Sequence, residues 1–179
     1  MKYEITDIKH PHNPKLRRIR ALVAIGFSVA AGDLGGYVEK PENLSQDGNA
    51  WVSGDAQVFG NAEVSGNARV YGDAQVFGNA EVSGNARVFG NAEVSGNARV
   101  YGDAWVSGDA EVMWFSKVGS ENGTLTAYYS KTKEIIVTRG CFIGTIDEFE
   151  RKVKEVHAGK KTEKEYLILI EYIKTRFGE

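Results

Sequence analysis

Apolar and polar positions alternate with a six-residue period through the middle of this chain. Valine recurs every six residues from Val52 to Val112, and an alanine stands two positions before each valine, from Ala50 to Ala110. Two positions before each alanine stands a glycine, and Asn or Asp always lies between them. The repeating unit is V-x-G-[ND]-A-x, in which small apolar residues alternate with variable ones, as in a strand with one buried face. Gly-Asn and Gly-Asp tolerate left-handed backbone conformations, so we expect each short strand to end in a fixed corner.

Short strands separated by regular corners predict a solenoid. A six-residue period is a mark of the parallel β-helix, in which three units close one triangular coil. Successive coils then stack about 4.8 Å apart through ladder hydrogen bonds. The eleven valine-centred strands predict a little under four coils, with valine and alanine filling the narrow interior.

The segment VFGNAEVSGNARVYGDAQ resembles the hexapeptide-repeat, left-handed β-helix family, whose members are usually trimers. The flanking sequences GDLGGYVEKPENLSQDGNAWV and TRGCFIGTIDEFE resemble a group of phage and bacterial proteins labelled transferases. The resemblance implies a left-handed winding and a homotrimer. It implies no particular chemistry, because one fold hosts many functions.

The fold class that we predict is all-β: a left-handed parallel β-helix with an N-terminal cap and a small α/β C-terminal segment. Residues 1–45 are expected to form the cap and the first strands, residues 46–117 the β-helix, and residues 118–179 a hairpin, a further strand and two helices. The cap is expected to cover the open end of the solenoid, where unpaired backbone groups would otherwise favour polymerisation.

Within the N-terminal part, apolar residues alternate over residues 19–29, which predicts a strand with one buried side. Residues 35–36, both glycine, are predicted to be a turn. Val38 and Leu44 are predicted to begin the first, irregular coil.

The C-terminal part departs from the repeat. Strands are predicted over residues 112–118, 124–130 and 134–138, with a turn over residues 119–123. Two helices follow, each with a capping-box pattern. The first box pairs Thr145 with Glu148, and the second pairs Thr162 with Glu165.

Composition narrows the possible partners. The 22 basic and 24 acidic residues give a net charge of −2, so nothing attracts the whole molecule to a nucleic-acid polymer or a membrane. The single cysteine, Cys141, excludes an intrachain disulfide and suits a reducing compartment. No signal peptide or membrane-spanning stretch is visible, and we expect a cytoplasmic protein.

Histidine placement argues against catalysis. Hexapeptide acyltransferases, which the repeat resembles, use a histidine on or beside the coils as a general base, and such a base must contact the proton that it takes. Here His10, His12 and His157 all lie outside the repeat, and no long loop interrupts it. We therefore expect no catalytic residue, no metal and no cofactor, with Cys141 a buried thiol and His157 a core histidine. The alternative is an acyltransferase in which the cap brings His157 to a subunit interface.

The residues on either side of each valine point outward, and a period of three units sorts them into three faces. The first face carries Trp51, Ser53, Arg69, Tyr71, Arg87, Phe89, Trp105 and Ser107. The second carries Gln57, Phe59, Gln75, Phe77, Glu93, Ser95, Glu111 and Met113. The third carries Glu63, Ser65, Glu81, Ser83, Arg99 and Tyr101. Exposed aromatic columns of this extent mark an interface, which trimerisation about an axis along the prism would bury.

Two arginines on the first face predict that an anion binds there. Arg69 and Arg87 are predicted on adjacent coils with backbones about 5 Å apart. At that separation like charges cost about 1 kcal/mol in water and about 3 kcal/mol at an effective dielectric near 20. The anion is either a carboxylate of a neighbouring subunit, from Glu63 or Glu81, or a ligand phosphate with an aromatic residue stacking on a base. The candidate ligand-binding residues are Arg69, Arg87, Trp51, Trp105, Tyr71 and Phe89.

Three functions follow from these alternatives. The one we favour is a non-catalytic, trimeric binding protein that holds a small anionic, nucleotide-like ligand in grooves between subunits. In the phage setting that the resemblance suggests, it would sequester a host signalling nucleotide. The second is a structural scaffold without a ligand, and the third is the acyltransferase with a cap histidine.

Overall fold

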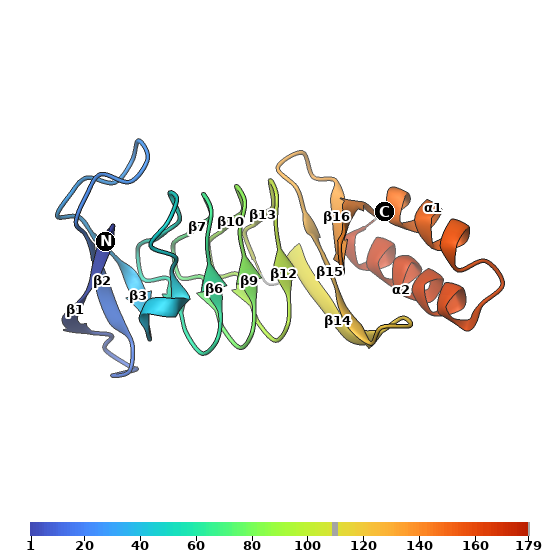
Figure 1. Cartoon of the computed structure of the whole chain (residues 1–179), viewed down its shortest axis with the longest axis horizontal. Coiled ribbons are helices and arrows are strands. Elements are labelled where there is room, and N and C mark those ends of the chain that lie inside the picture. Colours follow the sequence, from blue (N-terminus) through green and yellow to red (C-terminus); the bar gives the residue numbers. More distant parts are fainter. Residues whose placement is uncertain (109–110, 179) are drawn as a thin grey trace.

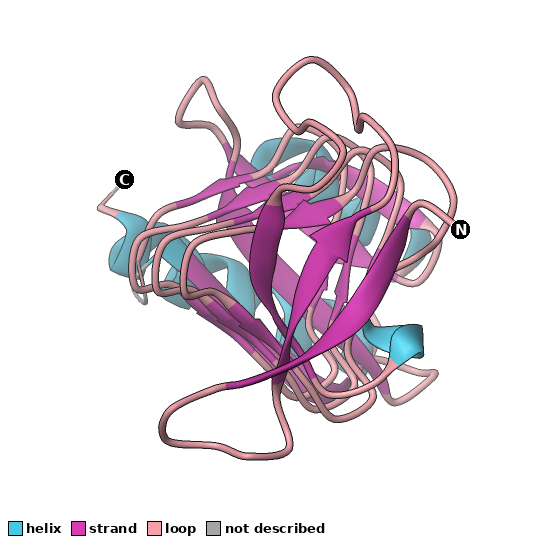
Figure 2. Ribbon diagram, turned by 90° about the vertical axis from the view of Figure 1, so that its left-hand side faces the viewer, coloured by secondary structure: helices cyan, strands magenta, loops and turns pink. Residues whose placement is uncertain are grey.

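The protein is a rod in which stacked parallel coils lie between two antiparallel sheets (Figure 1). The structure is a computed structural model, and it describes residues 1–108 and 111–178. Viewed along the rod, the coils superpose into a three-sided outline (Figure 2). The six-residue pattern thus forms a parallel β-solenoid, as predicted.

Each side of the rod is a parallel sheet built from every third strand. The first face contains β4 (Trp51–Val52), β7 (Arg69–Val70), β10 (Arg87–Val88) and β13 (Trp105–Val106). The second contains β3 (Leu34–Val38), β5 (Gln57–Val58), β8 (Gln75–Val76) and β11 (Glu93–Val94). The third contains β6 (Glu63–Val64), β9 (Glu81–Val82) and β12 (Arg99–Val100). The sorting of outward residues into three faces is therefore confirmed for β4 to β13.

The interior of the coils is a column of small apolar side chains. The repeat valines of β4 to β13 are 0 % exposed, and the repeat alanines from Ala50 to Ala104 are at most 2 % exposed. Ladder hydrogen bonds join each coil to the next; for example, Trp51 N donates to Ala68 O at 3.0 Å and Ser53 N donates to Val70 O at 2.9 Å. Valine and alanine suit this space because the three sheets leave room for little more.

The N-terminal cap is an antiparallel extension of the second face. The strands β1 (Tyr3–Lys9), β2 (Arg17–Ala21) and β3 pair in that order, and β3 continues in parallel with β5. A short 3-10 helix, η1 (Pro41–Asn43), leads into the coils. Val38 pairs with Val58 and Leu44 bridges Val64, so the predicted start of the first coil is confirmed.

Two predictions for the cap are wrong. The strand predicted over residues 19–29 ends at Ala21, and the chain continues as a loop in which Val23 and Phe27 are exposed. Apolar and polar residues continue to alternate beyond Ala21, but the strand ends because the pairing of β2 with β3 ends there. Residues 35–36 are not a turn: both glycines are buried inside β3. A Cβ added at Gly35 would lie 2.7 Å from Trp51 Cζ2, so these glycines allow β3 to cross the first coil closely.

The C-terminal sheet closes the other end of the rod. It consists of β14 (Val112–Val118), β15 (Gly123–Tyr129), β16 (Ile135–Arg139) and β17 (Phe142–Thr145) in antiparallel order. The predicted hairpin and third strand are confirmed, and β17 was not predicted. Val112 pairs with Tyr128 in β15, so it does not continue the second face. The prediction that Glu111 and Met113 extend that face is therefore wrong, and Ala110 lies outside the described residues.

Side-chain hydroxyl groups of this sheet satisfy the backbone of the last coil. The N–H of Arg99 donates to Thr126 Oγ1 at 2.9 Å, and Thr138 Oγ1 donates to the Arg99 carbonyl at 2.9 Å. Both threonines are buried. An unpaired buried backbone group is costly, so these hydroxyls stabilise the end of the solenoid at β12.

Two helices pack against this sheet, α1 (Ile146–Val156) and α2 (Lys161–Phe177). The capping box of Thr145 with Glu148 is confirmed at the start of α1. The second predicted box is wrong, because α2 begins before Thr162, with Lys160 at the N-cap and no side-chain cap. Neither of these helices, the only α-helices in the described part of the chain, is long and apolar enough to cross a membrane.

Candidate anion-binding trough

The first face of the solenoid lies between two projecting loops. Residues 22–33 connect β2 to β3 at one end, and residues 130–134 connect β15 to β16 at the other. Two cavities follow this face, one of about 790 Å³ beside the first loop and one of about 730 Å³ beside the second. Both are lined by Asn67, Arg69 and Arg87, so they form one continuous surface, which we call the trough.

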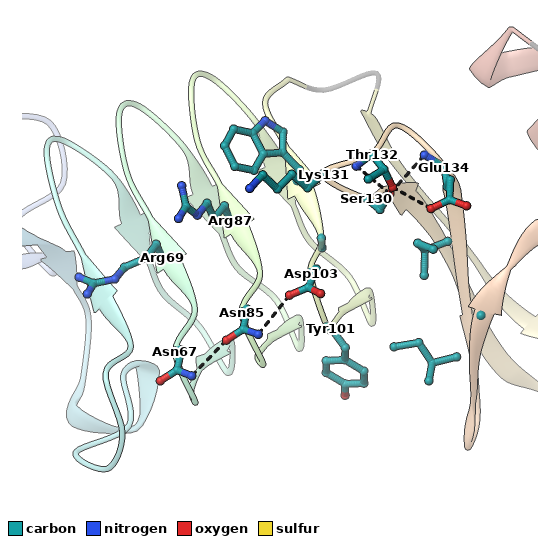
Figure 3. A pocket seen from close by; sticks show the side chains of 16 residues that line it. Asn67, Arg69, Asn85, Arg87, Tyr101, Asp103, Ser130, Lys131, Thr132 and Glu134 are labelled. Atoms are coloured by element: carbon teal, nitrogen blue, oxygen red, sulfur yellow. Dashed lines mark hydrogen bonds between the residues drawn. The ribbon is translucent and has the colours of Figure 1, made fainter. Parts of the chain in front are cut away.

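The two predicted arginines lie side by side at the centre of the trough (Figure 3). Arg69 in β7 and Arg87 in β10 are directly paired positions of the ladder, as expected. Arg69 is half-buried and Arg87 is exposed. Partial burial, and then the charge of Arg87, lower the pKa of Arg69 from its usual value. This lowering means that the environment disfavours the positive charge there, which a bound anion would offset.

Neither arginine forms an ion pair within the described chain. By contrast Arg99, at the same position of the repeat on the third face, lies 3.2 Å from a carboxylate oxygen of Glu81. The guanidinium of Arg69 instead lies beneath the 22–33 loop, where a Cβ added at Gly26 would be 3.0 Å from Arg69 Nη2. Gly26 also has a φ of +59°, so glycine is favoured there both by backbone conformation and by space.

A buried lysine adds positive charge at the N-terminal end of this face. Lys2 is 7 % exposed, and its Nζ donates to the carbonyl oxygens of Asp47 at 3.2 Å and Gly48 at 3.4 Å. Burial, and then the charge of Arg69, lower the pKa of Lys2 to about 8. This contact could not be predicted from the sequence, because Lys2 is far from the repeat along the chain and reaches it only through the fold of the cap.

Three of the four predicted aromatic residues come together along the trough. The rings of Tyr71 and Phe89 stack in parallel, with centroids 4.9 Å apart and planes 5° apart. Phe89 meets Trp105 edge to face, with centroids 5.2 Å apart. The Arg87 guanidinium lies over the Trp105 ring, 5.1 Å from its centroid. Such a geometry is a favourable cation–π contact.

The fourth, Trp51, lines the cavity beside the first loop but is almost fully covered. It points outward from its coil as predicted, but the cap covers it and leaves it only 3 % exposed. Its ring lies edge to face with Tyr3, with centroids 6.4 Å apart, and contacts the strand at Gly35. The cap thus leaves little of the Trp51 ring open for stacking, which the repeat alone does not show, and a role of Trp51 in ligand binding stays a prediction.

An amide ladder runs along the corner beside the trough (Figure 3). Asn67 Nδ2 donates to Asn85 Oδ1 at 3.1 Å, and Asn85 Nδ2 donates to Asp103 Oδ1 at 3.1 Å. The repeat pattern predicts these residues only as turn formers. Their regular spacing was a usable signal, since it places them on one corner next to the arginines. Lys131 and Phe27, which also line the trough, come from the two loops and carried no such signal.

The histidines and the cysteine lie away from the trough. His10 and His12 line a separate cavity of about 310 Å³, where the His10 ring meets Tyr37 edge to face with centroids 4.7 Å apart. His157 ends α1 and lies 5.8 Å from the ring of Tyr166. Cys141 is exposed, so the expectation of a buried thiol is wrong. Over residues 1–108 and 111–178, no three metal-ligating side chains converge on one point.

The repeat itself is shared with other proteins. Residues 56–72, 62–78 and 92–108 match the family model described as the YdcK β-solenoid repeat. This is a β-solenoid repeat protein. The match lies within the coils, so it agrees with the observed architecture and assigns no function to the trough. No curated protein matches the chain.

Proposed function

We propose that this protein is a non-catalytic binding protein that holds a small anionic, nucleotide-like ligand in the trough. The observation that carries the proposal is the Arg69–Arg87 pair, held in register on neighbouring strands without an ion-pair partner in the described chain. A phosphate would accept charge-assisted hydrogen bonds from both guanidinium groups, which are well suited to phosphate geometry. The stacked aromatic rings beside them fit the planar part of such a ligand.

Assembly belongs to the same proposal. We take the solenoid to wind left-handed and to form a homotrimer in the cytoplasm, with the trough at a subunit boundary. The resemblance of the repeat to the hexapeptide-repeat, left-handed β-helix family supports this assembly. Phe59 and Phe77 on the second face support it as well. Their half-exposed rings stack with centroids 4.9 Å apart and planes 3° apart, an apolar surface that a second copy would cover. In a phage-encoded protein, such a trimer would sequester a host signalling nucleotide.

A scaffold without a ligand is the second candidate, and one observation favours it. Glu81 already pairs with Arg99 within the chain, whereas the exposed Glu63 forms no ion pair in the described part of the molecule. The Glu63 carboxylate of a neighbouring subunit could therefore supply the anion between Arg69 and Arg87. In that arrangement the arginines would hold subunits together.

A thermal-shift experiment separates these candidates. Inorganic phosphate, pyrophosphate and a set of nucleotides would each be added to the purified protein. A ligand that binds only the folded state raises its melting temperature. We expect at least one anion to do so, and we expect the double variant Arg69→Ala/Arg87→Ala to abolish the rise. Arg99→Ala is the matched control, because it removes an arginine at the same repeat position on another face.

Mass measurement by light scattering completes the test. The binding proposal predicts a trimer for both the native protein and the double variant. If no anion stabilises the native protein, and if the double variant falls apart into monomers, the arginines serve assembly and the scaffold is correct.

A further inference from the structure

The aromatic column of the trough stops one coil short of the cap. Tyr71 and Phe89 each follow a repeat valine, and the corresponding residues of the coils before and after them are Ser53 and Ser107. Neighbouring coils of a parallel sheet lie about 4.8 Å apart, close to the observed 4.9 Å between the two rings. A serine is too small to continue the stack, so the place of a third ring remains unfilled above Ser53.

Among the stacked rings of the first face, Tyr71 has an aromatic neighbour on one side alone. Phe89 has Tyr71 on one side and the edge of Trp105 on the other. The Arg87 guanidinium lies over one face of the Trp105 ring, and Trp51 is buried under the cap. Tyr71 is covered by Phe89 on one side alone. Its other side faces the coil of Ser53, and the cavity of about 790 Å³ is lined by both of these residues.

The same cavity brings this ring face close to the arginine pair. Arg69 and Tyr71 flank Val70 in extended backbone and point to the same side, so their Cα atoms are about 7 Å apart. An anion between Arg69 and Arg87 would therefore be separated from a ring on Tyr71 by a short linker of the size of a sugar. Phe27, which is fully exposed at 112 %, lines the same cavity from the overhanging loop and provides a second apolar wall.

We propose that the place above Ser53 binds the planar ring of the ligand, stacked on Tyr71, with its phosphate between Arg69 and Arg87. The ligand class is then a nucleoside monophosphate, or a larger nucleotide that contains this unit. This inference rests on the proposed function and adds to it the position and the chemistry of a ring subsite.

The test compares two probes that share a phosphate and a sugar. Isothermal titration calorimetry would measure binding of adenosine 5′-monophosphate and of ribose 5-phosphate, which lacks the ring. Stacking of one base on an aromatic side chain contributes roughly 1–3 kcal/mol, which corresponds to a roughly 5- to 150-fold lower Kd for the nucleotide. We expect Ser53→Phe, which fills the place of the ring, to remove this advantage, so that the two probes bind with the same Kd.

Two further variants make the result specific. Ser65→Phe places the same side chain at the same repeat position on the third face, and it is expected to keep the full advantage of the nucleotide. Tyr71→Leu removes the stacking surface without filling the cavity, and it is expected to lose most of the advantage. It also serves as the test if Ser53→Phe does not fold.

The possible failures are distinguishable. If both probes bind with equal Kd, or if Ser53→Phe keeps the difference, the ring subsite is wrong and the anion site stands. If neither probe nor any other anion binds, the proposed function fails together with the subsite.

Discussion

The hydroxyl group of Tyr128 satisfies both backbone groups of Tyr101. It accepts a hydrogen bond from the Tyr101 N–H and donates one to the Tyr101 carbonyl, each at 3.1 Å. Tyr128 is 0 % exposed, and burial raises the pKa of its hydroxyl to about 12. One side chain of the C-terminal sheet thus replaces the ladder that a further coil would have provided.

Tyr128→Phe tests this closure. The variant leaves the half-buried N–H and carbonyl of Tyr101 without this partner, and we expect it to lower the free energy of unfolding by about 1–3 kcal/mol. Urea denaturation measures the change. Tyr172→Phe, at a 52 % exposed position, is the control and should be neutral. Equal stability of the two variants would show that water or another group serves Tyr101 instead.

The close crossing of the cap over the first coil predicts that β3 tolerates no side chain at its glycines. A Cβ at Gly35 would lie 2.5 Å from Ile19 Cγ1, and one at Gly36 would lie 2.6 Å from the Ala56 carbonyl oxygen. We expect Gly35→Ala and Gly36→Ala each to destabilise the protein by about 1–3 kcal/mol through overpacking. The control is Gly108→Ala, whose Cβ would meet no atom of the described residues closer than Asn91 Oδ1 at 3.9 Å. Thermal or urea unfolding of the three variants provides the comparison.

The lowered pKa of Lys2 predicts a pH dependence of stability. Because the folded pKa is about 8 and the usual value is 10.5, the unfolded chain binds more protons between these values. Stability contributed by this group is therefore lowest below pH 8 and rises with pH above it. Tyr3 lowers the stability as the pH rises above 10, since burial raises its pKa from 10.0 to about 12 and the folded state then holds the proton more tightly. The effect of Lys2 is thus isolated between pH 8 and pH 10.

Lys2→Met removes the titrating group. Relative to the native protein, we expect the variant to lose the rise in the free energy of unfolding between pH 8 and pH 10. Lys15→Met, at an exposed position, should keep it. Urea denaturation across this pH range is the measurement, and an unchanged rise in Lys2→Met would contradict the prediction.

The two helix starts give a matched pair of threonine variants. Thr145 Oγ1 accepts a hydrogen bond from the Glu148 N–H at 3.2 Å, so we expect Thr145→Ala to cost about 0.5–2 kcal/mol of stability. Thr162 lies inside α2 and caps nothing. Thr162→Ala should therefore be neutral or slightly stabilising, because alanine is the better helix former. A comparable loss in both variants would mean that α2 begins at Thr162.

The sequence by itself determined the coils and the central pair of the candidate site. A strict six-residue period leaves one way to bury valine and alanine, since a shift by one residue would turn every apolar side chain to solvent. That register places Arg69 beside Arg87 and Tyr71 beside Phe89, and the ladder shows them there. The C-terminal hairpin and α1 were also predictable, because turn residues and a capping box are local signals.

The tertiary structure alone decided what covers the repeat and what borders the trough. Trp51 and Trp105 occupy equivalent repeat positions, yet β3 buries the first and leaves the second half-exposed. The difference lies in contacts between segments far apart in the chain, which no local pattern encodes. For the same reason the contact of Lys2 with the carbonyls of Asp47 and Gly48, and the place of Phe27 in the trough, could not be assigned from the sequence. Periodicity specifies which way a side chain points from its own coil, and only the packing of the caps determines whether it then meets solvent, a loop or a strand.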